Sequence, residues 1–164
     1  MEIVNKVAQS SLEVFDLEDY FPTQPIVGID ISQWLLEGIV LKEKDFRDAL
    51  KNHQWNHYTN ALVYVYCSTD AILPAWATIL VTTYLQEAAF VALGTKENLL
   101  ENYYQNILEK VAFTQYQNKP VILKGCSKKS VPANAYIVAI QKLQQVAKSI
   151  MFGEACSAVP LYKK

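Results

Sequence analysis

The sequence predicts an α/β fold with a mainly parallel or mixed sheet flanked by helices. Short apolar runs bounded by glycine, proline or polar residues alternate with longer segments whose apolar residues follow a helical period. A Cys-Ser pair, a loop and a Pro-Ala-x-Ala sequence occur at 67–77 and again at 126–135, which suggests a strand–helix pseudo-repeat. Because the 164 residues contain no linker or low-complexity run, we expect one α/β domain over residues 1–164.

The N-terminal part is expected to begin with two strands. Apolar and acidic residues alternate over 12–17, as in a half-exposed strand, and 26–30 is a short apolar run. We expect these two strands to pair antiparallel at an edge. Asp30 or Ser32 can cap a short helix around 34–36.

The middle of the chain alternates helices with buried strands. Apolar and charged residues occupy opposite faces of a helix over 43–52. The continuous apolar run 61–66 is typical of a strand buried on both faces. Pro74 suits the first position of a helix that extends to about residue 86, and 88–93 is the next apolar run.

The C-terminal part is expected to contain two long helices and one strand between them. Thr95 begins a helix whose apolar residues keep a 3.6-residue period to about 113. A turn containing proline precedes the strand 121–123. The last helix is expected over 132–153, and the tail that follows it is short.

Composition excludes several classes of partner. The net charge is −1, and Arg47 is the only arginine, so we expect no nucleic acid and no anionic membrane as partner. No apolar run reaches the roughly 18 residues that a membrane-spanning helix needs. The N-terminus does not resemble a signal peptide, so a cytoplasmic location is expected. A homo-oligomer is compatible with this composition.

The three cysteines are the strongest chemical signal. Cys67 and Cys126 follow predicted strands, where ligands collect in parallel α/β sheets, and Cys156 follows the last predicted helix, from which the chain can turn back to the same edge. Three thiolates with an open fourth position suit an iron–sulfur cluster or zinc. The leading hypothesis is therefore a site for such a cofactor formed by Cys67, Cys126 and Cys156.

Other interpretations remain open, and the sequence does not decide whether the protein is an enzyme. Cysteine is often a buried filler, so the chain could be a non-catalytic interaction module with structural cysteines. Lysines surround Cys126, which makes it a candidate reactive thiol or persulfide carrier. His53 and His57 have the spacing of a metal pair, but their asparagine-rich surroundings favour a polar loop.

Several segments spread over the chain resemble the DUF2480 family of uncharacterised bacterial proteins. They are 2–8, 16–20, 41–47, the Cys67 turn through residue 77, and 148–154 leading to Cys156. Position 155 is alanine, where proline is expected in relatives. The resemblance implies no established activity. It suggests iron–sulfur assembly proteins as partners, through the sulfur-mobilisation genes that neighbour members of the family.

Overall fold

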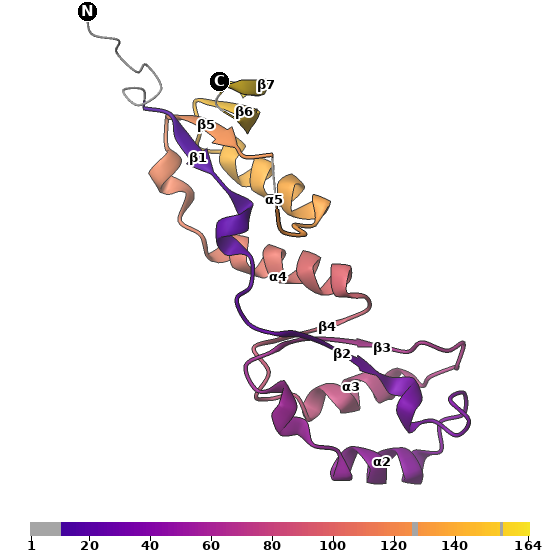
Figure 1. Ribbon diagram of the computed structural model, residues 1–164. Helices are drawn as coiled ribbons and strands as arrows, with labels where there is room; N and C mark the ends of the chain where they lie inside the picture. Colours follow the sequence, from indigo (N-terminus) through magenta and orange to yellow (C-terminus); the bar gives the residue numbers. More distant parts are fainter. Residues whose placement is uncertain (1–10, 126–127, 155) are drawn as a thin grey trace, which may run out of the picture. The chain divides into compact units, whose positions relative to one another are not determined.

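The computed structural model describes residues 11–125, 128–154 and 156–164 and has the predicted α/β fold (Figure 1). The chain divides into two compact units. Unit 1 comprises Met1–Phe21 and Tyr104–Lys164, and unit 2 comprises Pro22–Tyr103. Each unit has its own sheet, one mixed and one parallel, as the predicted fold class allows. That the whole chain folds as one domain stays a prediction.

Unit 2 is built on a parallel sheet with the strand order β2-β3-β4. Its strands are β2 (Ile26–Asp30), β3 (Leu62–Tyr66) and β4 (Phe90–Leu93). Its helices are α2 (Glu43–Asn52) and α3 (Ala75–Thr83), with 3₁₀ turns η2 (Ile31–Trp34) and η3 (Trp55–Tyr58). Both α-helices lie on one side of the strands (Figure 1), where they cover the apolar core.

Unit 1 has the strand order β1-β5-β6-β7. The strands are β1 (Glu13–Phe15), β5 (Pro120–Leu123), β6 (Ser149–Glu154) and β7 (Ser157–Lys163). The first three are parallel, and β7 pairs antiparallel with β6. The remaining elements are η1 (Leu17–Tyr20), α4 (Lys96–Lys110), η4 (Phe113–Tyr116) and α5 (Ala133–Gln144). Helix α4 crosses the boundary, so each unit includes part of it.

The two units repeat the same plan. In each unit the elements follow one another in the same order. The order is a strand, a 3₁₀ turn, an α-helix, a second 3₁₀ turn, a parallel strand, an α-helix and a further parallel strand. Buried residues of the two cores correspond at a separation of 58 positions, and the pairs are Phe46 with Tyr104, Leu50 with Leu108, Tyr58 with Tyr116, Val63 with Val121, and Leu85 with Leu143. The predicted pseudo-repeat is therefore part of a longer duplication. Unit 2 is inserted between Phe21 and Tyr104 of unit 1, after β1 and η1.

Two expectations about the sheet and the last helix are wrong. Strands β1 and β2 do not pair with each other, because β1 pairs parallel with β5 and β2 pairs parallel with β3. The last helix ends at Gln144, and 149–154 is strand β6. The reason is long-range pairing, since the backbone N–H of Lys148 donates to the carbonyl of Lys119, the residue before β5.

The C-terminal tail is also more ordered than expected, because it forms β7. Pro160 is tolerated there because β7 is an edge strand, in which a missing N–H can face away from the ladder. The other predicted helices and strands are present with shifted boundaries. Within the described ranges, no helix combines the length and apolarity needed to cross a membrane.

Candidate functional site

The loops that follow β2 and β3 are joined at one edge of the unit 2 sheet. Because these strands are parallel, their carboxyl ends meet at one edge of the sheet, where ligands usually bind in such folds. Asp30, the last residue of β2, accepts hydrogen bonds from the backbone N–H groups of Ser32 and Ser68, each at 3.0 Å. The hydroxyl oxygens of Ser32 and Ser68 are 3.2 Å apart. One carboxylate therefore joins the two loops.

The ionised form of Asp30 is favoured by these contacts. Desolvation by itself raises the pKa of this carboxyl group, but the hydrogen bonds from Ser68 and Ser32 outweigh it and lower the pKa to about 2. Asp30 is thus negatively charged at every pH at which the protein is expected to work. Its role is to hold the two loops together.

The loop after β2 contains a tight turn that carries aliphatic side chains. In this aliphatic turn, Leu36–Val40, Glu37 and Gly38 have positive φ angles of 53° and 75°, as type I′ turns require. The backbone N–H of Ile39 donates to the carbonyl of Leu36 at 3.0 Å, which closes the turn. Leu36, Ile39 and Val40 are all exposed, and Ile39 keeps 57% of its surface accessible. Tight turns are usually polar, so three exposed aliphatic side chains are unusual in this turn.

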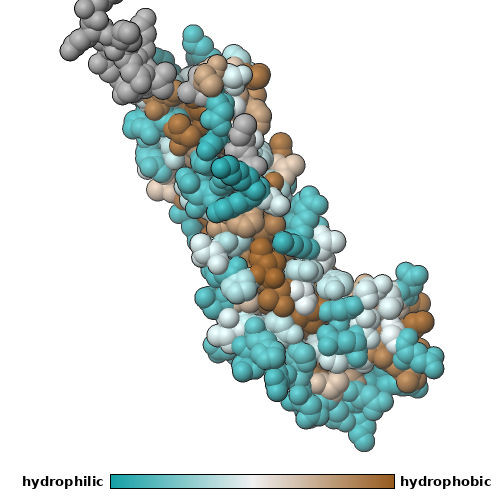
Figure 2. Space-filling model, viewed as in Figure 1, coloured by the Kyte–Doolittle hydropathy of each residue, from teal (hydrophilic) through white to brown (hydrophobic). Residues whose placement is uncertain are grey.

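A cleft of about 530 Å³ lies between the aliphatic turn and the loop after β3, and we call it the loop cleft. Figure 2 shows hydrophobic surface at the end of unit 2 where these two loops lie. The residues that line the cleft are Ile39, Val40, Leu41, Glu43, Asp70, Ile72, Pro74 and Trp76. Ile72 is 95% exposed at the edge of this cleft.

Two carboxylates give the loop cleft its charge, and they differ in their partners. Glu43 pairs with Arg47 at 3.1 Å, and the guanidinium of Arg47 also lies over the ring of Trp76 at 5.2 Å. Asp70 is exposed, and among the described residues nothing forms a hydrogen bond or ion pair with its carboxylate. The cleft therefore combines an apolar lining with one carboxylate that is available to a cationic partner.

Cys67 lies directly after β3, as predicted, and is half-buried against the core of unit 2. The hydroxyl of Thr69 donates its proton to the carbonyl of Gly38 at 2.6 Å. Since this proton is used, the Cys67 thiol must donate to the Thr69 oxygen, with Sγ and Oγ1 3.4 Å apart. In this arrangement the Cys67 side chain supports the aliphatic turn through Thr69, which is the behaviour of a structural cysteine.

Cys156 is exposed in the turn between β6 and β7 of unit 1. The expectation that it follows a helix is wrong, because a β-hairpin occupies that part of the chain. Cys126 lies outside the described residues. Because Cys67 and Cys156 belong to different units, the convergence of all three thiols stays a prediction. No group of three or more His, Cys, Asp or Glu side chains that could hold a metal occurs in the described part of the chain.

The duplication also shows that the Cys-Ser pairs are not equivalent positions. The prolines that precede α3 and α5, Pro74 and Pro132, are 58 residues apart, as are the core residues. At that separation Cys67 corresponds to Gly125, and Ser68 corresponds to position 126. The cysteines of the two repeats are therefore displaced by one position, so the sequence similarity of the two turns does not make them matched ligands.

The position of His53 is explained by packing. The Nε2 atom of His53 lies 2.8 Å from the Tyr58 hydroxyl, and its ring packs edge-on against Trp34 and Trp55. Burial, and to a smaller extent the charge of His57, lowers the pKa of His53 below its ordinary value. His53 is thus a partly buried residue that packs among the aromatic side chains of unit 2.

Neither the curated proteins nor the solved structures yielded a match to this chain. The family model described as a protein of unknown function, DUF2480, matches residues 1–164. It covers the whole chain, including both repeats and all three cysteines. The chain therefore belongs to the DUF2480 family.

Proposed function

We propose that this protein acts in the cytoplasm as a non-catalytic interaction module, and that the loop cleft of unit 2 holds a segment of a protein partner. The observation that carries the proposal is the gathering of exposed aliphatic side chains on two joined loops. Single exposed aliphatic residues are common on protein surfaces and need no explanation. Ile39, Val40 and Ile72, in contrast, all border one cleft. Burying one such side chain fully is worth about 1.5–3 kcal/mol, so partner binding would recover that free energy.

The charge of the cleft specifies the chemistry of the partner segment. Asp70 offers an unpaired carboxylate beside the apolar lining, and unit 2 contains nine acidic but only five basic residues. A segment that carries an aliphatic side chain next to a lysine or arginine fits both features. The hydrogen bond that Asp30 accepts from Ser68 and the one that Thr69 donates to Gly38 hold the two loops in place before binding, which reduces the entropy that binding must offset.

This proposal is tested with peptides selected from a random display library against the intact protein. The selected peptides are expected to pair an aliphatic residue with lysine or arginine. Ile72→Glu should weaken their binding about tenfold or more, since about 1.4 kcal/mol corresponds to a factor of ten. Asp70→Asn should weaken it less, and its effect should shrink at high salt.

Val159→Glu is the matched control, because Val159 is a similarly exposed aliphatic residue on β7 of unit 1. Affinities are measured by isothermal titration calorimetry. If the peptides bind Ile72→Glu as tightly as the unchanged protein, the loop cleft is not their site and the proposal is wrong.

We propose as a second function the binding of an iron–sulfur cluster or zinc, with iron–sulfur assembly proteins as the partners. One observation supports the two cysteines of unit 1 as ligands of the same cofactor. Strands β5 and β6 are adjacent and parallel, so their carboxyl ends share an edge, and Cys156 follows β6 by two residues. Gly125, which precedes Cys126 in the sequence, would contact the ring of Phe152 in β6 if it carried a Cβ.

Anaerobic purification tests the cofactor directly. A thiolate-bound cluster is expected to absorb near ~400 nm and to contain iron and sulfide, whereas zinc would be colourless and seen by elemental analysis. Cys126→Ala and Cys156→Ala should each abolish the signal, and Cys67→Ala reports whether unit 2 supplies the third ligand. A protein without iron or zinc after anaerobic preparation would end this proposal. The alternative reactive-thiol role of Cys126 would then be examined by its alkylation rate.

A further inference from the structure

The outer edge of β4 in unit 2 has no strand partner among the described residues. The sheet of unit 2 ends at β4, whereas the corresponding strand of unit 1, β6, is followed in the sheet by β7. An open strand edge presents unpaired backbone N–H and C=O groups and readily pairs with another chain. Comparison of the two units therefore shows that unit 2 lacks the strand that corresponds to β7 of unit 1 among the described residues.

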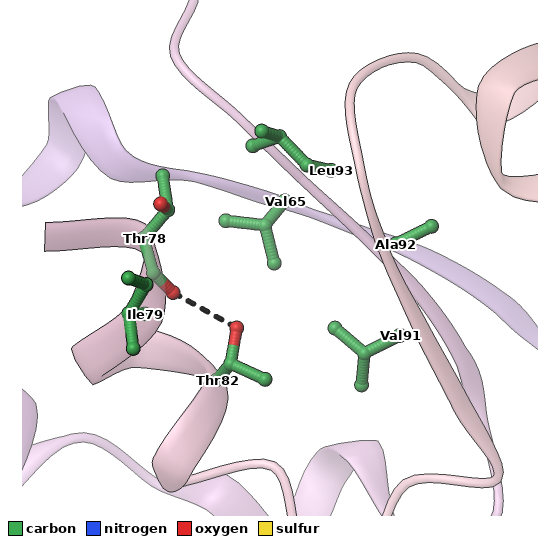
Figure 3. Close-up of a pocket in the computed structure, with 7 residues that line it drawn as sticks. All are labelled: Val65, Thr78, Ile79, Thr82, Val91, Ala92 and Leu93. Carbon is green, nitrogen blue, oxygen red and sulfur yellow. Dashed lines mark hydrogen bonds between the residues drawn. The ribbon is translucent and has the colours of Figure 1, made fainter. Parts of the chain in front are cut away.

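A cleft of about 260 Å³ lies beside this edge, between α3 and β4 (Figure 3). In Figure 3, Val65 and Val91 extend from the strands toward Thr82 on α3. Ile79 on α3 and Leu93 at the end of β4 also line it, and they are 65% and 64% exposed. The edge thus adjoins an apolar surface that solvent reaches.

Unit 1 shows what occupies the corresponding place. There β7 pairs antiparallel with β6, and the register sets Tyr162 opposite Ile150. Ile150 is the counterpart of Val91. Ile150 is the register partner of Val121 in β5, and Val91 is the register partner of Val63 in β3, the residue that corresponds to Val121. The ring of Tyr162 packs against the core of unit 1. A complete version of unit 2 would therefore contain an antiparallel strand that supplies an apolar side chain opposite Val91.

The composition of this surface indicates what supplies that strand. Between Ala71 and Leu93 the only charged residue is Glu87, and α3 itself carries no charge. A helix that is uncharged on its exposed face is unusual unless that face is covered. Interfaces between identical chains are depleted of charge at their centre, and a surface without charge does not repel its own copy.

We propose that a second copy of this chain pairs its β4 antiparallel with the β4 of the first, so that the two parallel sheets of unit 2 join into one. A two-fold axis perpendicular to the sheet keeps both α3 helices on the same face. Ile79 and Leu93 of each copy then cover the cleft of the other. This surface is distinct from the loop cleft, so the two proposals succeed or fail independently.

Analytical ultracentrifugation over a dilution series tests the proposal. The unchanged protein is expected to sediment with twice the mass of one chain. Ile79→Lys and Leu93→Lys should each weaken dimerisation about tenfold or more, because lysine on an edge strand or its flanking helix opposes pairing. The control is Ile137→Lys on α5, since Ile137 is the counterpart of Ile79, 58 positions later, and is 55% exposed. This control should leave the dimer intact.

Hydrogen exchange provides a second measurement that needs no variant. The backbone amides of β4 that face its open edge should become more protected as the concentration of the unchanged protein rises. A protein that remains monomeric at all concentrations overturns the proposal, and so does a dimer that both lysine variants leave unchanged. Circular dichroism of each variant shows that loss of the dimer does not come from loss of the fold.

Discussion

Phe46→Ala and Tyr104→Ala are each expected to lower the free energy of unfolding by about 3–5 kcal/mol, as for other large buried aromatic residues. The two side chains are counterparts in the two repeats, and both are fully buried. Tyr104 also donates its hydroxyl proton to the carbonyl of Leu17 at 2.7 Å. Tyr104→Phe should therefore cost only about 1 kcal/mol, the typical share of one hydrogen bond.

Urea denaturation of these variants also tests whether the chain is one domain. Helix α4 carries buried residues of both units, with Leu99 and Leu100 before the boundary and Leu108 after it. Because a helix is cooperative, loss of one unit removes support from the α4 residues of the other. We expect one unfolding transition, which both alanine substitutions shift. Two transitions, each shifted by only one of the substitutions, would show that the units unfold separately.

Asp30→Ala is expected to destabilise the protein by about 2 kcal/mol, because two backbone N–H groups lose a charged acceptor. The pH dependence of stability follows from its pKa. The carboxyl group titrates at 3.8 when unperturbed and at about 2 in the folded protein, so the unfolded chain binds the proton first as the pH falls. The stabilisation by Asp30 is present above pH 3.8 and is lost as the pH falls through about 2.

The matched control for Asp30 is Asp16, which has the same place in unit 1. Asp16 accepts from the backbone N–H of Glu18 at 2.9 Å and pairs with Lys124 at 3.4 Å. Asp16→Ala should leave peptide binding at the loop cleft unchanged, whereas Asp30→Ala should weaken it. The measurements are urea denaturation between neutral and acidic pH and calorimetry with the selected peptides. A variant Asp30→Ala whose stability falls with acid as steeply as that of the unchanged protein would contradict this account.

Local patterns were enough to predict the fold class and most of the elements. The apolar run 61–66 and the amphipathic segment 43–52 contain their own signals, so β3 and α2 lie where expected. The pairing of β1 was not predictable in this way, because its partner β5 is more than a hundred residues later. The segment 149–154 has an apolar composition that suits either a helix or a strand, and only its pairing with β5 and β7 decides between them.

The candidate site was only partly accessible from the sequence. Residue chemistry drew attention to the cysteines, but Cys67 donates a hydrogen bond to Thr69 within a loop, and the grouping of Cys67, Cys126 and Cys156 stays a prediction. The loop cleft was missed because its residues come from two loops separated by some thirty positions. One local signal was present, since a glycine turn flanked by Leu36, Ile39 and Val40 is too aliphatic for an ordinary surface turn.

The insertion of unit 2 within unit 1 has a consequence for the order in which the chain folds during synthesis. All strands and helices of the unit 2 sheet layer are translated before β5, the partner of β1, leaves the ribosome. Strand β1 therefore has no pairing partner during the time in which unit 2 is synthesised and folds. Closing unit 1 is a late event that joins the beginning of the chain to its end, and a ribosome-bound chain that stops after Tyr103 would hold a folded unit 2 with an unpaired leading strand.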